Sequence, residues 1–227
     1  MVSVPSGLLT FRVNSAALRT VLRSIGVLIL NLFFACSGAI AATPDSTILV
    51  FGDSLSAGYG MRADQGWATL LQQRLSAEGY GQRVVNASVS GETTSGGMNR
   101  LERALDLHKP AVVVLELGAN DGLRGLPLNT VADNLSAMVR AIKQRKARVL
   151  LVGLQLPPNY GPQYTRGFRD MFTQLAKRHD TALVPFMLDK VALDERFMQP
   201  DGLHPNVQGQ PLLLDTIWPY LKPLLQR

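Results

Sequence analysis

Ser54 follows a short apolar run in ILVFGDSLSAGYG, residues 48–60, and is the first candidate for a chemically active side chain. A serine hydroxyl is a weak nucleophile near neutral pH, so it needs a base beside it. Serine and aspartate are also common at turns and at the first positions of helices. Ser54 could therefore be a nucleophile at the end of a strand or only a helix cap, and partners elsewhere must decide.

One of the three histidines stands where a base for Ser54 would be needed. His108 and His179 each come just before an expected strand, whereas His204 follows the last expected strand, in QPDGLHP. A basic side chain at the carboxyl end of a helix is favourable, which accounts for His108 and His179. We expect His204 to be the catalytic base. Asp201, three residues earlier, would orient its ring, although an Asp-Gly pair is also a common turn.

Three groups could stabilise the negative oxygen that forms when a nucleophile attacks an acyl carbonyl. They are the backbone N–H groups of Ser54 and Gly91 and the side-chain amide of Asn120. Gly91 lies in SGETTSGG and Asn120 in GANDGLRG, and each stretch follows a different expected strand. Each residue could also be an ordinary turn residue, so their joint occurrence after successive strands is the stronger indication of an oxyanion hole.

The elements that must position these residues follow from the alternation of two patterns. Short aliphatic runs predict strands at 47–51, 83–87, 111–117, 148–156 and 182–186, and amphipathic segments predict helices between them and after residue 206. Repeated strand–helix alternation predicts an α/β protein, a three-layer α/β/α sandwich with a five-stranded, mostly parallel sheet. In such sheets, binding sites lie beyond the carboxyl ends of the strands, which is where the candidate residues fall.

Composition and motifs disfavour several other kinds of protein. Hydrophobic residues make up 46% of the chain and charged residues 18%, so a folded core is expected. No basic stripe with interleaved aromatic residues indicates nucleic-acid binding. Ser56 stands where a G-x-S-x-G motif would require glycine, and neither a P-loop nor a G-x-G-x-x-G motif is present. Three scattered histidines make a zinc site unexpected, and we expect no metal.

The four stretches together resemble the GDSL, or SGNH, hydrolase family over residues 46–223. GDS with Ser54 is similar to the first family block, Gly91 to the second, GANDGLRG with Asn120 to the third, and DGLHP with Asp201 and His204 to the fourth. Within the family, GANDGLRGLP, LPPNYGPQY and PDGLHPN are similar to the exported bacterial thioesterase I, lysophospholipase L1 and arylesterase group.

The resemblance implies a flavodoxin-like fold and a serine esterase that needs no cofactor. It implies hydrolysis of acyl thioesters, lysophospholipids and aryl or short-chain esters through an acyl-enzyme. The sequence departs from the expected pattern at Ala119, where a second glycine was expected, and at Glu92, where aspartate was expected. We expect a monomer whose partner is a small-molecule substrate. An apolar wall for the acyl chain is expected from Leu123, Leu126, Leu156, Pro157, Pro158 and Tyr160, although these could equally be loop-packing residues.

Two other functions stay open at this point. An enzyme that removes acetyl groups from polysaccharide would share the fold and the serine chemistry, but the apolar loops disfavour it. A lipid- or carbohydrate-binding module without activity could also have kept the fold, but the complete set of Ser54, Asp201 and His204 disfavours that reading.

The first 41 residues have the composition of an export signal. They contain three arginines and no acidic residue, and their apolar run IGVLILNLFFA is too short for an ordinary membrane-spanning helix. The small residues of AIAA fit cleavage after Ala41 or Ala42. We expect a signal peptide over residues 1–41 and a hydrolase domain over residues 42–227, located in the periplasm or secreted, with no membrane anchor after cleavage.

An uncleaved membrane anchor and a lipoprotein modified at Cys36 are the alternatives. LFFAC is a poor lipidation signal, because Phe33 and Phe34 are bulky where small residues are usual. Cys36 is the only cysteine, so the mature domain could form no disulfide. Removing residues 1–41 takes away three of the 23 basic residues and none of the 17 acidic ones, which leaves a formal charge of +3.

We predict that the protein isolated from the exported fraction begins at Ala42 or Thr43, because the small-residue pattern follows the apolar run directly. Amino-terminal sequencing and intact mass measure this. A chain that still begins near Met1, or a diacylglycerol on Cys36, would contradict the prediction.

Overall fold

The computed structural model describes residues 47–225, and these contain one five-stranded sheet in which every pair of neighbouring strands is parallel. The strand order is β2-β1-β3-β4-β5. The strands are β1 (Thr47–Gly52), β2 (Arg83–Asn86), β3 (Val112–Glu116), β4 (Arg148–Val152) and β5 (Ala182–Val184). This confirms the predicted α/β class and the predicted number of strands.

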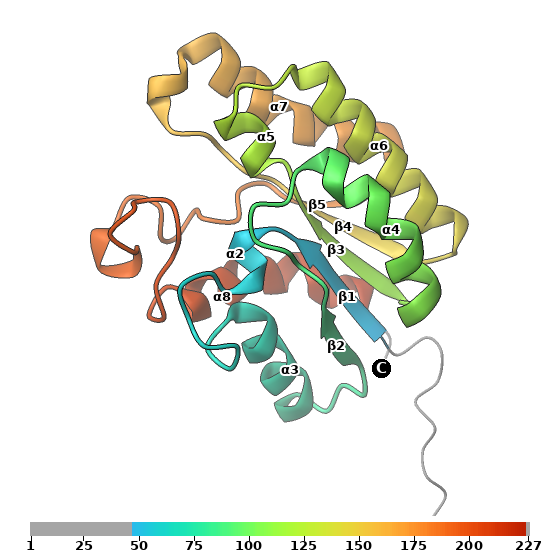
Figure 1. Cartoon of the computed structure of the whole chain (residues 1–227). Helices are drawn as coiled ribbons and strands as arrows, with labels where there is room; N and C mark the ends of the chain where they lie inside the picture. Colours follow the sequence, from blue (N-terminus) through green and yellow to red (C-terminus); the bar gives the residue numbers. More distant parts are fainter. Residues whose placement is uncertain (1–46, 226–227) are drawn as a thin grey trace, which may run out of the picture. The chain divides into compact units, whose positions relative to one another are not determined.

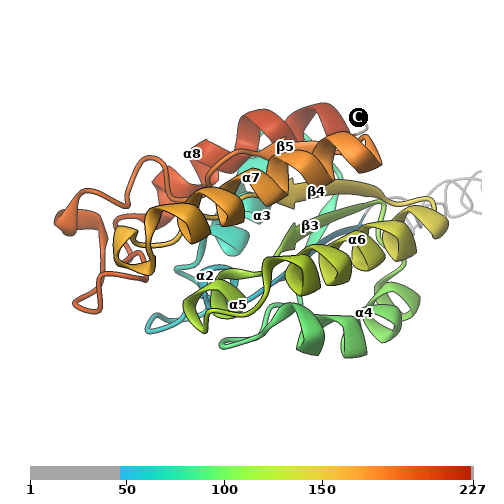
Figure 2. The same ribbon diagram turned by 90° about the horizontal axis from the view of Figure 1, so that it is seen from above.

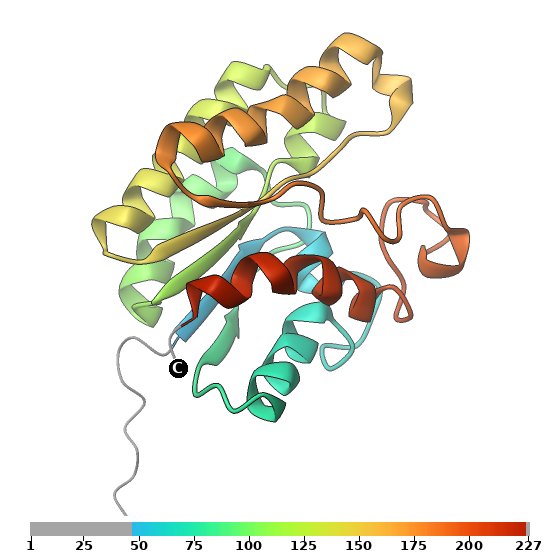
Figure 3. The ribbon, with the colours of Figure 1, turned by 180° about the vertical axis from the view of Figure 1, so that it is seen from behind.

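Helices cover both faces of the sheet (Figures 1 and 3). One layer contains α3 (Trp67–Ala77) and α8 (Gln210–Leu221), which pack against each other. In the other layer α6 (Leu128–Gln144) packs between α4 (Thr94–His108) and α7 (Pro162–His179). Shorter elements are α2 (Ser54–Ala57), α5 (Ala119–Leu123), η2 (Pro158–Tyr160), η3 (Glu195–Phe197) and η4 (Lys222–Leu224).

The two helical layers explain why the central strands are apolar on both faces. All six residues of β1 and all five of β3 are buried, so neither strand alternates between polar and apolar positions. The helices contribute one apolar stripe each, such as Val131, Leu135 and Met138 on α6. Burial of large aliphatic side chains at about 1.5–3 kcal/mol each is the main favourable contribution to this fold.

Two predicted boundaries differ from the structure by more than two residues. The fourth strand ends at Val152 rather than at residue 156, and the last helix begins at Gln210 rather than directly after Asn206. Beyond Gly153 the chain leaves the sheet and reaches Pro157 and Pro158, which have no N–H group to donate to a strand ladder. The residues that leave the sheet line the cavity described below.

The strand order places a topological switch point between β1 and β3. The chain leaves β1 to one side of the sheet to form β2, and later enters β3 on the other side of β1. Clefts in doubly wound sheets form at such points, beyond the carboxyl ends of the strands. Figure 2 shows that α2, α5 and the segment between β5 and α8 lie at this same end of the sheet.

No helix within residues 47–225 has both the length and the apolar character needed to cross a membrane. The predicted signal peptide over residues 1–41 lies outside the described residues.

We predict that Gly153→Ala destabilises the protein, because the added Cβ would lie 2.4 Å from the carbonyl oxygen of Pro185 and 2.7 Å from that of Val184. Both atoms belong to backbone that cannot move easily, so we expect the free energy of unfolding to fall by about 1–3 kcal/mol. Urea titration measures this. Gly81→Ala is the matched control, because a Cβ there meets nothing within 4 Å. An equal loss in both variants would contradict the prediction.

Candidate active site

Ser54 is the first residue of α2, directly beyond the carboxyl end of β1. The preceding residue, Asp53, caps this short helix, because its Oδ1 accepts the backbone N–H of Leu55 at 3.0 Å. The capping role that sequence reasoning left open for Ser54 therefore belongs to Asp53. The hydroxyl of Ser54 is left to interact with a residue from the far end of the chain.

That residue is His204, whose Nε2 lies 2.8 Å from Ser54 Oγ. On the other side of the ring, His204 Nδ1 lies 2.6 Å from Asp201 Oδ2. An ionised carboxylate can only accept hydrogen bonds, so Nδ1 carries the proton and Nε2 is the acceptor for the serine hydroxyl. The structure thus brings together the three residues that sequence reasoning selected as nucleophile, base and orienting acid.

A tight turn presents Asp201 and His204 to Ser54. Asp201 Oδ1 accepts the backbone N–H groups of Leu203 and His204 at 2.9 and 3.0 Å, and Gly202 has a positive φ of 66°. The backbone N–H of Gln199 donates to His204 O at 2.7 Å, which closes the turn. Partial burial raises the pKa of Asp201, but the hydrogen bonds from His204 and Leu203 outweigh it, so this pKa lies below its ordinary value.

Tyr59 covers one face of the imidazole. The two ring centroids are 4.6 Å apart and the planes are inclined by 39°. Gln199 Nε2 donates to Tyr59 O at 2.8 Å, which ties the segment after α2 to the turn that carries His204. This packing limits the orientations open to the ring of His204.

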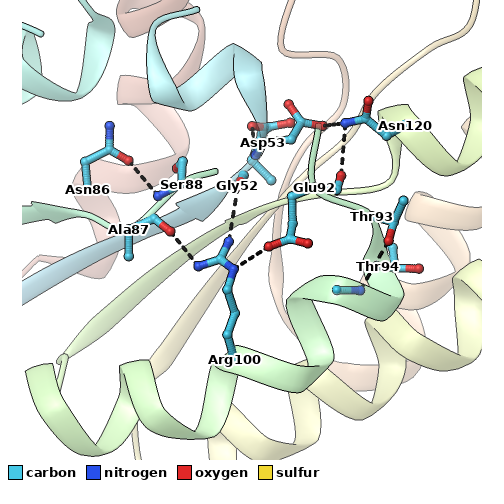
Figure 4. A network of polar contacts seen from close by, with 12 residues as sticks. Gly52, Asp53, Asn86, Ala87, Ser88, Glu92, Thr93, Thr94, Arg100 and Asn120 are labelled. Atoms are coloured by element: carbon cyan, nitrogen blue, oxygen red, sulfur yellow. Dashed lines mark hydrogen bonds and ion pairs between the residues drawn. The ribbon is translucent and has the colours of Figure 1, made fainter. Parts of the chain in front are cut away.

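Gly91 and Asn120 lie with Ser54 on the wall of the same cavity. Gly91 has a positive φ of 79°, a conformation that favours glycine. Asn120 belongs to the short helix α5 beyond β3, and its Nδ2 donates to Glu92 O at 2.9 Å and to Asp53 Oδ2 at 3.2 Å (Figure 4). Both hydrogens of the Asn120 amide are therefore engaged by these two acceptors.

Arg100 of α4 fixes the loop that contains Gly91. Its Nη1 donates to Ala87 O at 2.6 Å and its Nε pairs with Glu92 Oε2 at 2.5 Å (Figure 4). The guanidinium also lies over the ring of Phe51, 3.9 Å from the centroid. Glu92, which the sequence analysis noted as a departure from the expected aspartate, is thus an ion-pair partner that holds this loop.

A cavity of about 740 Å³ opens beside Ser54 and His204. Of the six residues expected to form an apolar wall, it is lined by Leu123, Leu156, Pro157 and Pro158. Leu126 and Tyr160 do not line it. Tyr160 instead donates from its hydroxyl to Leu123 O at 2.9 Å, so it supports the wall from behind.

A second part of the cavity wall was not predicted from the sequence. The segment between β5 and α8 contributes Phe186, Leu188, Asp189, Ala192, Leu193 and Met198. This segment extends outward beyond the strands in Figure 1, drawn in orange and red. Its apolar residues have neither strand nor helix periodicity. A run of apolar residues without periodicity after the last strand is the only feature of the sequence that could have indicated this wall. Leu193 is fully exposed, so its presence cannot be explained by core packing.

The other two histidines lie at helix ends, as predicted. His108 is the last residue of α4 and His179 the last residue of α7. His179 Nε2 lies 2.6 Å from Ser136 Oγ, and burial lowers its pKa. Within residues 47–225, no group of three or more His, Cys, Asp or Glu side chains is arranged to hold a metal ion.

Ser54, His204 and Asp201 are joined by short hydrogen bonds and lie at the switch point of a doubly wound parallel sheet. This combination of site and α/β fold defines a serine hydrolase.

Comparison with known proteins identifies the family. Residues 50–212 match the model of the GDSL-like Lipase/Acylhydrolase family, and the chain belongs to this family. It is 51% identical to Esterase TesA of Pseudomonas aeruginosa over 179 residues, which cover 79% of this chain and 89% of that protein. It is 41% identical to thioesterase 1/protease 1/lysophospholipase L1 of Escherichia coli over 185 residues, covering 82% of this chain and 87% of that protein.

A solved structure agrees with this assignment. The psychrotrophic esterase EstA from Pseudoalteromonas, in a form inhibited by monoethylphosphonate, matches with a TM-score of 0.76 and 41% identity. The match covers 79% of this chain and 98% of that one. The family resemblance inferred from the four sequence blocks is confirmed, and the protein is an esterase.

Proposed function

We propose that Ser54 is the nucleophile of this esterase, His204 its general base and acid, and Asp201 the carboxylate that orients His204. The observation that carries the proposal is the continuous chain from Asp201 Oδ2 through both ring nitrogens to Ser54 Oγ, with separations of 2.6 and 2.8 Å. Those distances are short enough for proton transfer without rearrangement of the chain.

The reaction proceeds through an acyl-enzyme. As Ser54 Oγ bonds to the acyl carbon, its proton passes to His204 Nε2, and the resulting imidazolium is stabilised by Asp201. The tetrahedral intermediate collapses, the bond to the leaving oxygen or sulfur breaks, and His204 protonates that atom. Water then gives a proton to His204 and attacks the acyl carbon. The acid is released when Ser54 recovers the proton from His204.

The oxyanion is stabilised by the N–H groups of Ser54 and Gly91 and by the amide of Asn120. Because Glu92 O and Asp53 Oδ2 engage both hydrogens of Asn120 Nδ2, one hydrogen must be released for the oxyanion. The bond to Asp53 Oδ2, at 3.2 Å, is the longer of the two and is the one we assign to this exchange. The bond to Glu92 O then keeps the amide in place.

The substrate is an acyl ester or thioester whose apolar chain occupies the cavity beside Ser54. The lining is mainly aliphatic and proline, which suits hydrocarbon better than sugar. Relatives named arylesterase and thioesterase 1/lysophospholipase L1 support aryl esters, thioesters and lysophospholipids as the substrate classes. An apolar cavity beside Ser54 therefore favours these substrates over acetylated polysaccharide.

Residues 1–41 serve as an export signal, and residues 42–227 form the hydrolase, which acts in the periplasm or outside the cell as a monomer. The absence of acidic residues in this leader, its short apolar run and the small residues before Ala42 support this part of the proposal.

Ser54→Ala and His204→Ala should each abolish nearly all hydrolysis of p-nitrophenyl esters, because the triad acts as a unit and its loss typically costs about 10⁴-fold or more. The double variant should be little worse than either single one. His108→Gln is the control, since His108 ends α4 away from the carboxyl edge of the sheet. Retention of most activity in His204→Ala, or its loss in His108→Gln, would refute the assignment of the base.

Asn120→Ala should lower kcat about a hundredfold with a small change in KM, because the amide would bind a charge that exists only in the transition state. Steady-state kinetics and thermal unfolding measure the two effects separately. Asn134→Ala is the matched control, since its Nδ2 also makes a side-chain hydrogen bond, to Thr94 Oγ1 at 3.0 Å, outside the cavity wall. A kcat for Asn120→Ala within about threefold of the parent, against that hundredfold expectation, would remove Asn120 from the oxyanion hole.

A further inference from the structure

Two carboxyl groups outside the triad of Ser54, His204 and Asp201 are buried next to the turn that contains Ser54. Asp53 and Glu116 are both 0% exposed. Glu116 is the last residue of β3, and it lies in register with Gly52 at the end of β1. Placing one carboxyl group in the interior is costly, and placing two together is more so. Because this arrangement is costly, we expect the two carboxyl groups to have a specific role beside Ser54.

The carboxyl of Glu116 holds the turn that presents Ser54 at two points. Its Oε2 accepts the hydroxyl of Ser56 at 2.7 Å and the backbone N–H of Asp53 at 3.2 Å. One donor immediately precedes Ser54 in the chain and the other lies two residues beyond it. The two bonds therefore fix the backbone on both sides of the nucleophile.

Gly52 shows how closely this carboxyl is packed on the turn. A Cβ at position 52 would lie 2.5 Å from Glu116 Oε2 and 2.8 Å from Glu116 O. Both contacts are shorter than real Cβ contacts, so any other residue at this position would displace Glu116 or the end of β1. The glycine that begins the Gly-Asp-Ser stretch is thus explained by Glu116, which is distant from it in the sequence.

Asp53 extends the same connection to the oxyanion side of the site. Its Oδ1 accepts the N–H of Leu55 and its Oδ2 accepts Asn120 Nδ2. One continuous set of contacts therefore runs from Glu116 through the turn around Ser54 to the amide of Asn120. The nucleophile and the oxyanion donor are positioned against the same pair of buried side chains.

We propose that Glu116 is a positioning residue for the esterase reaction, whose buried carboxyl holds the β1–α2 turn so that Ser54 Oγ stays aligned with His204 Nε2 and Asn120. The proposal rests on the function of Ser54 proposed above. Glu116 does not touch the substrate, and it acts through Ser56 and the backbone of Asp53.

Glu116 carries out this role in its protonated, uncharged form. Burial raises its pKa well above the ordinary value, and the neighbouring Asp53 carboxylate raises it further. Oε2 accepts two hydrogen bonds, but Oε1 is buried with no hydrogen-bond partner among the described residues, so no donor there offsets the cost of a negative charge. Burial also raises the pKa of Asp53 to about 6.

The first experiment compares kcat, KM and the rate at which a fluorophosphonate labels Ser54. Glu116→Ala removes both bonds to the turn and should lower kcat and the labelling rate by about 10- to 100-fold, with little change in KM. Glu116→Gln keeps an uncharged side chain with an acceptor oxygen and should stay within about threefold of the parent, far from that loss. Equal losses in both variants would overturn the proposal.

If Glu116→Ala does not fold, Ser56→Ala tests the same contact. It removes the hydroxyl bonded to Glu116 Oε2 and should lower the labelling rate by about three- to tenfold, a smaller misplacement than in Glu116→Ala. Ser136→Ala is the matched control, because Ser136 is also buried and bonds through its hydroxyl, to His179. Equal kcat values in the two serine variants, at comparable losses of Tm, would reduce Glu116 to a structural residue.

The pH dependence of stability tests the uncharged form of Glu116. A carboxyl whose pKa is raised in the folded state keeps its proton while the same group in the unfolded chain ionises. The contribution of Glu116 to the stability of the parent therefore falls as pH rises above about 4.5. Glu116→Gln lacks this loss, so its Tm should exceed that of the parent by a margin that widens from pH 4.5 to 8. Asp53, His204 and Asp121, which act on this pair, are the same in both proteins. Parallel Tm profiles would show that Glu116 is ionised and would overturn this part of the proposal.

These outcomes are distinguishable from failure of the proposed function. A parent protein that neither hydrolyses esters nor reacts with the fluorophosphonate at Ser54 would refute the function itself. A reactive parent whose reactivity does not depend on Glu116 or Ser56 would refute only the positioning role.

Discussion

The pairing of β1 with β3 is the constraint on which the active site depends. The two strands are buried on both faces and their last residues, Gly52 and Glu116, lie side by side. Ser54 lies two residues beyond the end of β1, and Asn120 lies four residues beyond the end of β3. Because the strands are parallel and in fixed register, these two groups meet at one edge of the sheet without any long flexible connection.

The site combines an apolar surrounding with a few polar groups that are each held in place. Arg100 ties the loop around Gly91 to Ala87, and Asp53 and Glu92 hold the amide of Asn120. Buried polar groups are costly unless they are hydrogen-bonded, so these contacts limit the alternative positions that the site can adopt. A reaction that develops charge on one oxygen atom benefits from donors that are oriented before the charge appears.

Substrate-facing residues come from a different part of the architecture than the reacting groups. The reacting groups lie next to the buried strands or in the tight turn that contains Asp201 and His204. The cavity wall is formed by loops beyond β3 and β4 and by the segment between β5 and α8. Loops can vary without disturbing the sheet, so this division lets the fold keep its chemistry while the shape of the cavity changes.

The sequence by itself determined the α/β class, the five strands, the family and the five candidate residues for the reaction, because apolar runs and short motifs are local properties. These residues are Ser54, Gly91, Asn120, Asp201 and His204. It placed His204 rather than His108 or His179 near Ser54 through the order of strands alone. It did not reveal that Asp53 is the helix cap, that Glu116 packs on Gly52, or that the β5–α8 segment lines the cavity. Those features depend on strand register and on loops without periodicity, and so only the tertiary structure decided them.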